Sequence, residues 1–129
     1  LQGQPEYPMQ YRAGRYTYQD FLDRGMILHE YMASFLHAKV AVIDDKVMIG
    51  SSNLDPFSLL LAREANILSD DADLARALCE DLRHAIDHES QRIRSEALRK
   101  RGRLQRLVDA LAYAALRAGV LLTGQATRY

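Results

Sequence analysis

The strongest constraint on the fold is a pair of short apolar runs, residues 36–43 (LHAKVAVI) and 47–50 (VMIG), joined by a polar turn at residues 44–46. Two such runs, rich in β-branched residues and separated by turn residues, are typical of a β-hairpin. Because side chains alternate between the two faces of a strand, the hairpin places His37 and Lys39 side by side on one face. We therefore expect a sheet that carries two basic side chains on one face.

Along the rest of the chain, most strands are predicted before the helices. Residues 26–31 and 63–68 are expected to be further strands, and residues 51–58 a polar loop. Residues 10–24 are expected to form a helix that ends at Gly25. Three more helices are expected: one from Asp70 or Asp71 to about Asp87, a short one capped by Ser95, and one over residues 103–121. This pattern predicts an α/β domain with a mixed sheet flanked by helices.

The charges are balanced in number but not in position. The chain has 17 basic and 17 acidic side chains, with acids concentrated in residues 69–89 and bases in residues 92–106. The basic stretch can meet an anionic surface of lipid or nucleic acid. Charge alone favours a simpler interpretation, in which the two stretches are solvated helix faces that pair with each other.

The last expected helix is strongly apolar. One stripe of it consists of Leu104, Leu107, Val108, Leu111, Ala115 and Ala118. Asp109 and Arg117 interrupt the apolar run, and no segment of the chain reaches the roughly 20 uncharged apolar residues of a membrane span. Two interpretations stay open: a helix in the membrane interface beside the basic stretch, and a core helix that packs on the sheet or on a missing part of the protein.

Cysteine and the paired histidines give weak signals. Cys79 is the only cysteine, so an intrachain disulfide is excluded and a reducing compartment is favoured. His84 and His88 are four residues apart on an expected helix, which suits the edge of a metal site. We favour a solvated helix face, because no third ligand is indicated.

The residues with a clear chemical signal are His37, Lys39 and Asp44, in the pattern His-x-Lys-x4-Asp. A lysine is costly to bury on a sheet without a charge partner, and a phosphate would be such a partner. Imidazole is a competent nucleophile toward phosphorus, and it also serves as a general acid or base near neutral pH. The lysine then supplies fixed positive charge while negative charge develops on the phosphate oxygens.

Three further residues extend this predicted phosphate site. The sequence GSSN at residues 50–53 follows the hairpin, so Ser51 and Asn53 are expected at the same end as His37, where both can donate to phosphate oxygens. Glu64 lies in the next expected strand and can hold the second ring nitrogen of the histidine. Each signal alone is weak, since short turns also have such sequences. Their conjunction, in order and at short spacing, carries the functional prediction.

The segment HAKVAVIDDKVMIGSSNLDPFSLLLAREANI (residues 37–67) resembles the second catalytic motif block of the phospholipase D superfamily. The form GSSNLDPFSL followed by REANI is most similar to bacterial cardiolipin synthases, and the resemblance covers roughly residues 10–70. It implies a phospholipase D fold and transfer of a phosphatidyl group between alcohols, giving cardiolipin from phosphatidylglycerol. It also implies a site built from two motifs, in which one histidine forms a phosphohistidine and the other protonates the leaving alcohol.

The resemblance implies a role for each matched residue. Because the match is to the second motif, His37 is expected to act mainly as the general acid and base. Glu64 falls where the histidine-orienting carboxylate of the family lies. The other matches are Lys39 for the motif lysine, Ser51 and Asn53 for the phosphate-binding pair, and Asp44 for the motif aspartate, which in the family is more structural than chemical. No metal or other cofactor is required.

The chain departs from the family pattern because it carries one motif only. The other histidines, His29, His84 and His88, are not followed by a lysine two residues later. One copy of the chain therefore cannot build the whole site. Either an N-terminal half with the first motif lies upstream, or two copies pair across a twofold axis. The first residue is leucine rather than methionine, which favours the first arrangement.

These inferences divide the chain into a loose lead-in (residues 1–9), a catalytic half (residues 10–90) and basic amphipathic helices (residues 91–129). The expected partners are a phospholipid substrate and a membrane surface, with peripheral attachment to the cytoplasmic face of the bacterial inner membrane. Two rival functions stay open. One is a homodimeric phosphodiesterase that acts on nucleic acid, the less expected partner, and the other is an inactive membrane-docking half. Activity on phospholipid vesicles, compared with DNA, discriminates the nuclease from phosphatidyl transfer, and vesicle binding without turnover would support the inactive half.

Overall fold

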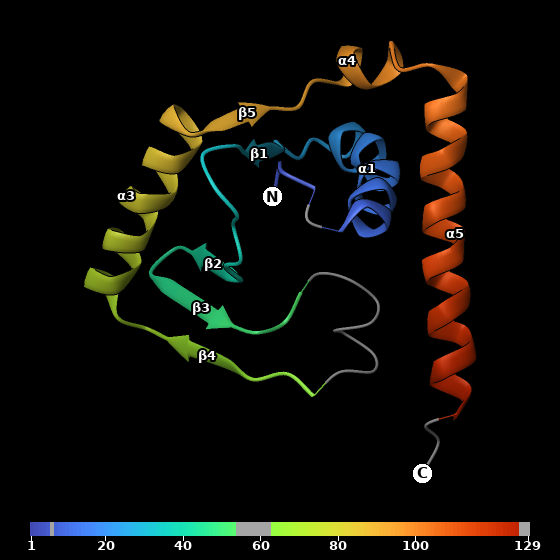
Figure 1. Cartoon of the computed structure of the whole chain (residues 1–129). Coiled ribbons are helices and arrows are strands. Elements are labelled where there is room, and N and C mark those ends of the chain that lie inside the picture. Colours follow the sequence, from blue (N-terminus) through green and yellow to red (C-terminus); the bar gives the residue numbers. More distant parts are fainter. Residues whose placement is uncertain (6, 54–62, 127–129) are drawn as a thin grey trace.

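The computed structural model describes residues 1–5, 7–53 and 63–126, and it shows an α/β arrangement of two small sheets with helices around them (Figure 1). The elements in chain order are α1 (Pro8–Asp23), β1 (His29–Tyr31), β2 (Val40–Ile43), β3 (Lys46–Gly50), β4 (Asn66–Ser69), α3 (Ala72–His88), β5 (Ser90–Arg92), α4 (Ser95–Arg99) and α5 (Arg103–Ala126). α3 and α5 lie on opposite sides of the molecule, with the sheets and α1 between them (Figure 1). The expected α/β class is confirmed.

The expected hairpin is present as β2 and β3, which belong to a three-stranded antiparallel sheet of order β2-β3-β4. Its turn is shorter than expected, because Lys46 already pairs with Ile43. Asp44 has a φ of 54°, a left-handed conformation that aspartate tolerates better than most residues. β2 is also shorter than expected and begins at Val40, so His37 and Lys39 lie just before the strand.

A second sheet joins distant parts of the chain, since β1 pairs with β5 in antiparallel fashion. The first residues extend this sheet. The Gly3 N–H donates to the Tyr31 carbonyl at 3.0 Å, and the Tyr31 N–H donates to the Leu1 carbonyl at 2.8 Å. The expectation of a loose lead-in is therefore corrected for residues 1–3, which run alongside β1.

The expected helices are present, with one corrected cap. Asp71 caps α3, because its carboxylate accepts the N–H groups of Asp73 at 2.9 Å and Leu74 at 3.1 Å. Ser95 does not cap α4, since it is the first helical residue and Arg94 occupies the cap position. The Ser95 hydroxyl instead accepts a 2.8 Å hydrogen bond from the side-chain amide of Gln19 on α1.

α5 packs on α1, but not through its apolar stripe. Among the residues of α5 up to position 122, Asp109 and Val120 are buried. The Asp109 carboxylate lies 2.5 Å from an Arg101 guanidinium nitrogen and 3.6 Å from one of Arg12 on α1. The predicted stripe around Leu104 and its neighbours is exposed, so the expectation that α5 packs this stripe on the sheet is corrected for the described part of the chain.

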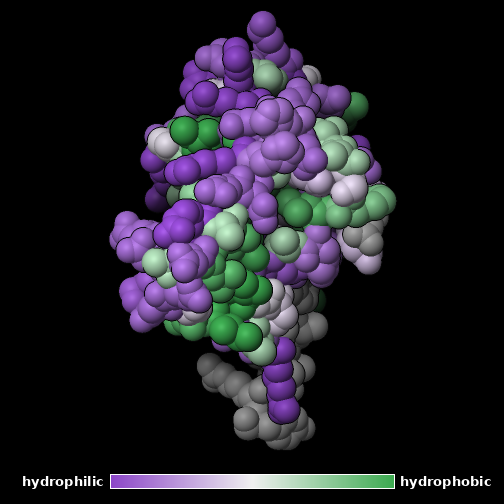
Figure 2. All heavy atoms as spheres, turned by 90° about the vertical axis from the view of Figure 1, so that its left-hand side faces the viewer, coloured by the Kyte–Doolittle hydropathy of each residue, from purple (hydrophilic) through white to green (hydrophobic). Residues whose placement is uncertain are grey.

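The core is small for a chain of this size. One cluster consists of Tyr18, Ile93 and Leu98, with Leu22 and Leu28 packed against it, and Val47 in β3 is 1% exposed. The chain exposes 9880 Å², whereas a folded monomer of the same mass exposes about 6,900 Å². Figure 2 shows part of this excess as apolar side chains gathered in the lower half of the face that carries α3. The fold therefore leaves apolar surface that its own elements do not cover.

Candidate active site

His37 and Lys39 face each other just before β2. The Lys39 ammonium nitrogen lies 2.8 Å from His37 Nε2, which makes Nε2 the acceptor and requires the ring proton on Nδ1. His37 is exposed and Lys39 half-buried. The two side chains therefore meet as the sequence predicts, although the backbone carrying them is extended rather than part of a strand. An anion placed here would contact a fixed positive charge and an imidazole nitrogen together.

Ser51 lies at the same end of the hairpin. The Gly50 N–H donates to the Lys39 carbonyl at 3.0 Å. Ser51, the next residue, is therefore adjacent in sequence to a residue that is hydrogen-bonded to the backbone of Lys39. The Ser51 N–H donates to the Ala65 carbonyl at 3.1 Å, and the Ala65 N–H donates back to the Ser51 hydroxyl oxygen at 3.1 Å. These bonds fix Ser51 against the backbone that leads into β4.

Glu64 is bound to Ser51. The Ser51 hydroxyl donates to the Glu64 carboxylate at 2.5 Å, a short and charge-assisted hydrogen bond. The arrangement connects the segment after β3 to the segment before β4. Glu64 lies ahead of β4, which begins at Asn66 rather than at residue 63 as expected. The role of Glu64 in orienting the histidine stays a prediction.

Asn66 takes a position that sequence reasoning missed. A Cβ at Gly50 would lie 1.8 Å from Asn66 Oδ1, so the absence of a side chain at Gly50 makes room for Asn66. The Asn66 amide donates to the Ser52 hydroxyl at 2.8 Å and holds the GSSN segment from the second side. Its place follows from the strand register, in which Gly50 and Asn66 are directly paired across β3 and β4, and no local sequence pattern shows that pairing.

Asp44 and Asn53 lie at opposite ends of the hairpin. Asp44 lies in the turn beyond β2, at the end of the hairpin away from Lys39. Asp44 lies five positions along the extended chain from Lys39, about 16 Å away, which favours the structural role for Asp44. Asn53 is exposed and follows Ser51 and Ser52 beyond the end of β3, and the rest of the expected loop, residues 54–58, lies outside the described residues.

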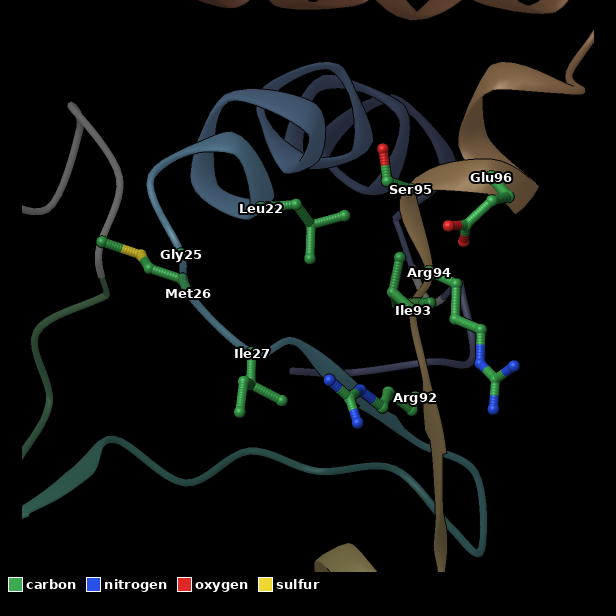
Figure 3. A pocket seen from close by; sticks show the side chains of 9 residues that line it. All are labelled: Leu22, Gly25, Met26, Ile27, Arg92, Ile93, Arg94, Ser95 and Glu96. Atoms are coloured by element: carbon green, nitrogen blue, oxygen red, sulfur yellow. The ribbon is translucent and has the colours of Figure 1, made fainter.

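A hollow of about 480 Å³ lies away from these residues, between the end of α1, the approach to β1 and the β5–α4 connection. Its walls combine apolar side chains with the guanidinium groups of Arg92 and Arg94 (Figure 3). None of the motif residues lines it. The candidate site is the end of the hairpin and not this hollow, because the hairpin brings together groups that can transfer a proton and bind an anion.

Metal-ligand geometry is not found in the described part of the chain, where no group of three or more histidine, cysteine, aspartate or glutamate side chains could hold an ion. His84 and His88 stack with ring centroids 4.5 Å apart on the exposed face of α3. Among the described residues, no helix combines the length and the apolarity needed to cross a bilayer.

A histidine next to a lysine, with a serine fixed at the same end of the hairpin, is an arrangement that can bind an anion and transfer a proton. Comparison with known proteins assigns the family. The family described as "Cardiolipin synthase, PLD-like domain" matches residues 1–86, two thirds of the chain. The chain therefore belongs to this family, and the recognised resemblance is confirmed.

The curated relatives are much longer than this chain. Cardiolipin synthase B of Escherichia coli (strain K12) is 34% identical over 125 residues, which are 96% of this chain and 30% of that protein. Cardiolipin synthase B of Salmonella typhi matches to the same extent. Cardiolipin synthase 2 of Bacillus anthracis is 32% identical over 111 residues, 85% of this chain and 21% of that protein. The chain thus spans less than a third of these relatives, and no solved structure matches it significantly.

Proposed function

We propose that the chain supplies one of two motifs to an enzyme that transfers a phosphatidyl group between alcohols and makes cardiolipin from phosphatidylglycerol. The observation that carries the proposal is the contact between His37 and Lys39, 2.8 Å apart, at the end of the hairpin where Ser51 is fixed. The names of the curated relatives, cardiolipin synthases B and 2, support the substrate class.

In this reaction His37 acts as the general acid and base. The histidine of the other motif attacks phosphorus and forms a phosphohistidine, while His37 gives its proton to the departing glycerol oxygen. His37 then takes the proton of the second alcohol, which attacks the phosphohistidine and releases the new phosphodiester. Lys39 and Asn53 stabilise the negative charge on the non-bridging oxygens during both steps, and Ser51 does so when its hydroxyl proton turns from Glu64 to the phosphate. Glu64 orients His37, and no metal takes part.

The second motif comes from another polypeptide segment, either the N-terminal half of a longer protein or a second copy of the chain. Two observations support a partner of this kind. Ile49 and Ile67 are paired on one face of the three-stranded sheet, and Ile67 is 72% exposed. The exposed area exceeds the value for a monomer of this mass by about 3,000 Å², the scale of a large obligate interface.

The proposed location is the cytoplasmic face of the bacterial inner membrane, with peripheral attachment. A phospholipid substrate supports this location, since its head group lies at the bilayer surface. The division of the chain into a catalytic half over residues 10–90 and amphipathic helices over residues 91–129 is part of the same proposal. The two parts are joined by hydrogen bonds, because β5, which lies at the boundary near residue 90, pairs with β1.

The test combines sedimentation of the purified chain with turnover of phosphatidylglycerol vesicles and, separately, of DNA. A His37→Ala variant is compared with His84→Ala, which removes another exposed histidine that lies on α3. A dimer that makes cardiolipin, and loses this activity only in His37→Ala, supports completion of the site by two copies. An inactive chain that becomes active with the N-terminal half supports the longer protein. Cleavage of DNA and not of phospholipid, or equal activity of both variants, would refute the proposal.

A further inference from the structure

The hollow between the end of α1 and the β5–α4 connection, of about 480 Å³, has the volume of a small-molecule site. Its apolar lining includes Leu22 near the end of α1, Ile27 ahead of β1 and Ile93 after β5. Ile93 is 8% exposed and belongs to the core cluster, and its N–H donates to the Leu28 carbonyl at 2.9 Å. The hollow is therefore bounded by backbone that the core and the sheet hold in place.

Two arginines bring positive charge to the hollow. Arg92 is the last residue of β5, and Arg94 follows two positions later in extended conformation, with φ −113° and ψ 140°. Positions two apart on an extended chain are about 7 Å apart, a spacing from which two long side chains can reach the same phosphate. Both arginines line the hollow and both are exposed (Figure 3).

The charge of these two arginines is not neutralised. Within residues 1–5, 7–53 and 63–126, neither Arg92 nor Arg94 forms an ion pair. Glu96 also lines the hollow, and its carboxylate lies near α4, whereas the two guanidinium groups lie farther toward β5 (Figure 3). The lining thus sets two positive charges against one negative charge, which favours an anionic ligand.

Two acids at the end of α1, next to the hollow, already have partners. Asp20 Oδ2 lies 3.2 Å from Arg24 Nε, and Asp23 Oδ1 lies 3.8 Å from a guanidinium nitrogen of Arg99. These pairs leave the balance of charge at the hollow unchanged.

We propose that the hollow binds the phosphate group of an amphiphilic phosphate ester, as a second anion site in addition to the one at the hairpin. Arg92 and Arg94 would contact the phosphate oxygens, since a guanidinium offers several N–H donors in a fixed fork that matches phosphate. Met26 and Ile27, which are 52% and 64% exposed, would cover the apolar part of the ligand. Their removal from water would add to the affinity.

The combination of groups selects this class of ligand. Inorganic phosphate would leave Ile27 in water, and a neutral apolar molecule would leave both guanidinium groups without a partner. An amphiphilic phosphate ester uses both kinds of wall, and it can come from a phospholipid or from a soluble ester. None of the motif residues lines the hollow, so this binding does not depend on the proposed reaction.

Isothermal titration calorimetry of the chain with dihexanoyl phosphatidylglycerol, kept below its micelle concentration, tests this site. A charge-assisted hydrogen bond is worth about tenfold or more in affinity, so Arg92→Gln/Arg94→Gln should bind the lipid about 100-fold more weakly. The control Arg103→Gln/Arg106→Gln removes the same charge from exposed positions of α5 and should bind like the wild type. Equal affinity of the two double variants would overturn the proposal.

The choice of ligand tests the apolar wall and the source. Ile27→Ser should weaken binding of the lipid about tenfold and leave binding of inorganic phosphate unchanged. Equal affinity of the wild type for the lipid and for inorganic phosphate would show a plain anion site, and the assignment to an amphiphile would fail. Tighter binding of the lipid than of hexyl phosphate supports a phospholipid as the source, and the reverse order supports a soluble ester.

A further variant separates this site from the hairpin. Lys39→Gln removes the positive charge beside His37 and should leave binding of the lipid at the hollow unchanged. If Lys39→Gln abolishes this binding, the phosphate lies at the hairpin and the proposal fails. No turnover is measured, so a chain that binds the lipid through Arg92 and Arg94 but makes no cardiolipin would count against the proposed reaction alone.

Discussion

Replacing Gly50 by alanine should destabilise the sheet and displace Ser51. A Cβ at this position would lie 1.8 Å from Asn66 Oδ1 and 2.8 Å from the Ala65 carbonyl oxygen. The Asn66 side chain can rotate away, but it then loses its 2.8 Å hydrogen bond to Ser52. The Ala65 carbonyl is less free to move, because it accepts the Ser51 N–H at 3.1 Å.

The expected loss of stability has two parts. The hydrogen bond from the Asn66 amide contributes about 1 kcal/mol. Forcing a methyl group against the Ala65 backbone costs about 2 kcal/mol more, within the range for overpacking. A total of about 3 kcal/mol lowers the midpoint of thermal unfolding by about 12 °C in a chain of this length. Circular dichroism of Gly50→Ala during heating measures this shift.

A double-mutant cycle tests the reasoning. Asn66→Ala removes the closest clashing atoms and should cost only about 1 kcal/mol, for the lost hydrogen bond. In the double variant Gly50→Ala/Asn66→Ala that hydrogen bond is lost once, so the total should fall about 1 kcal/mol below the sum of the single variants. An unchanged midpoint in Gly50→Ala, or strict additivity in the cycle, would refute the steric explanation.

Other substitutions probe the helices and the core. Asp109→Ala leaves the guanidinium of Arg101 without its buried partner and should lower the free energy of unfolding by about 3 kcal/mol. Urea unfolding should show a lower midpoint, and an unchanged midpoint would contradict the role of this pair. Asp71→Ala removes the α3 cap and should cost about 1 kcal/mol, measured in the same way. Burial, with the nearby Glu30 carboxylate, raises the pKa of Tyr18, so its protonated form is favoured in the folded state. The free energy of unfolding should therefore fall as pH rises above the ordinary tyrosine pKa of about 10. When Tyr18→Phe is measured at the same pH values, its free energy of unfolding should lack this part of the decline.

Local patterns in the sequence predicted the elements whose causes are local. The hairpin followed from two β-branched runs around a polar turn, and its pairing is confirmed. The helix after Asp71 followed from a capping residue and apolar spacing, and α3 begins at the next residue. The meeting of His37 and Lys39 followed from the two-residue period of extended chain, which holds even though β2 begins only at Val40.

The elements that depend on distant partners were missed. Residues 90–92 carry polar side chains and show no strand pattern, yet they pair with β1 more than 50 residues earlier. Ser95 looked like a helix cap, but a contact with Gln19 across 76 residues determines its place. For α5, the apolar stripe correctly predicted a helix. It did not predict which face is buried, because the packing on α1 uses the face of Asp109 and Val120. Periodicity records which residues share a face and carries no information on what covers it.

The strand order β2-β3-β4 limits how two chains can share a site. In the part of the chain that the structure describes, β2 has an unpaired side, to which the same strand of a second copy could add. A twofold axis makes such strands antiparallel, so with β2 fully overlapped the two copies of His37 would stand about 30 Å apart. A continuous six-stranded sheet formed through β2 would therefore be inactive, however stable it is. Two motifs can converge on one phosphorus only if the partners meet face to face, which makes sheet extension a competing and unproductive form of assembly.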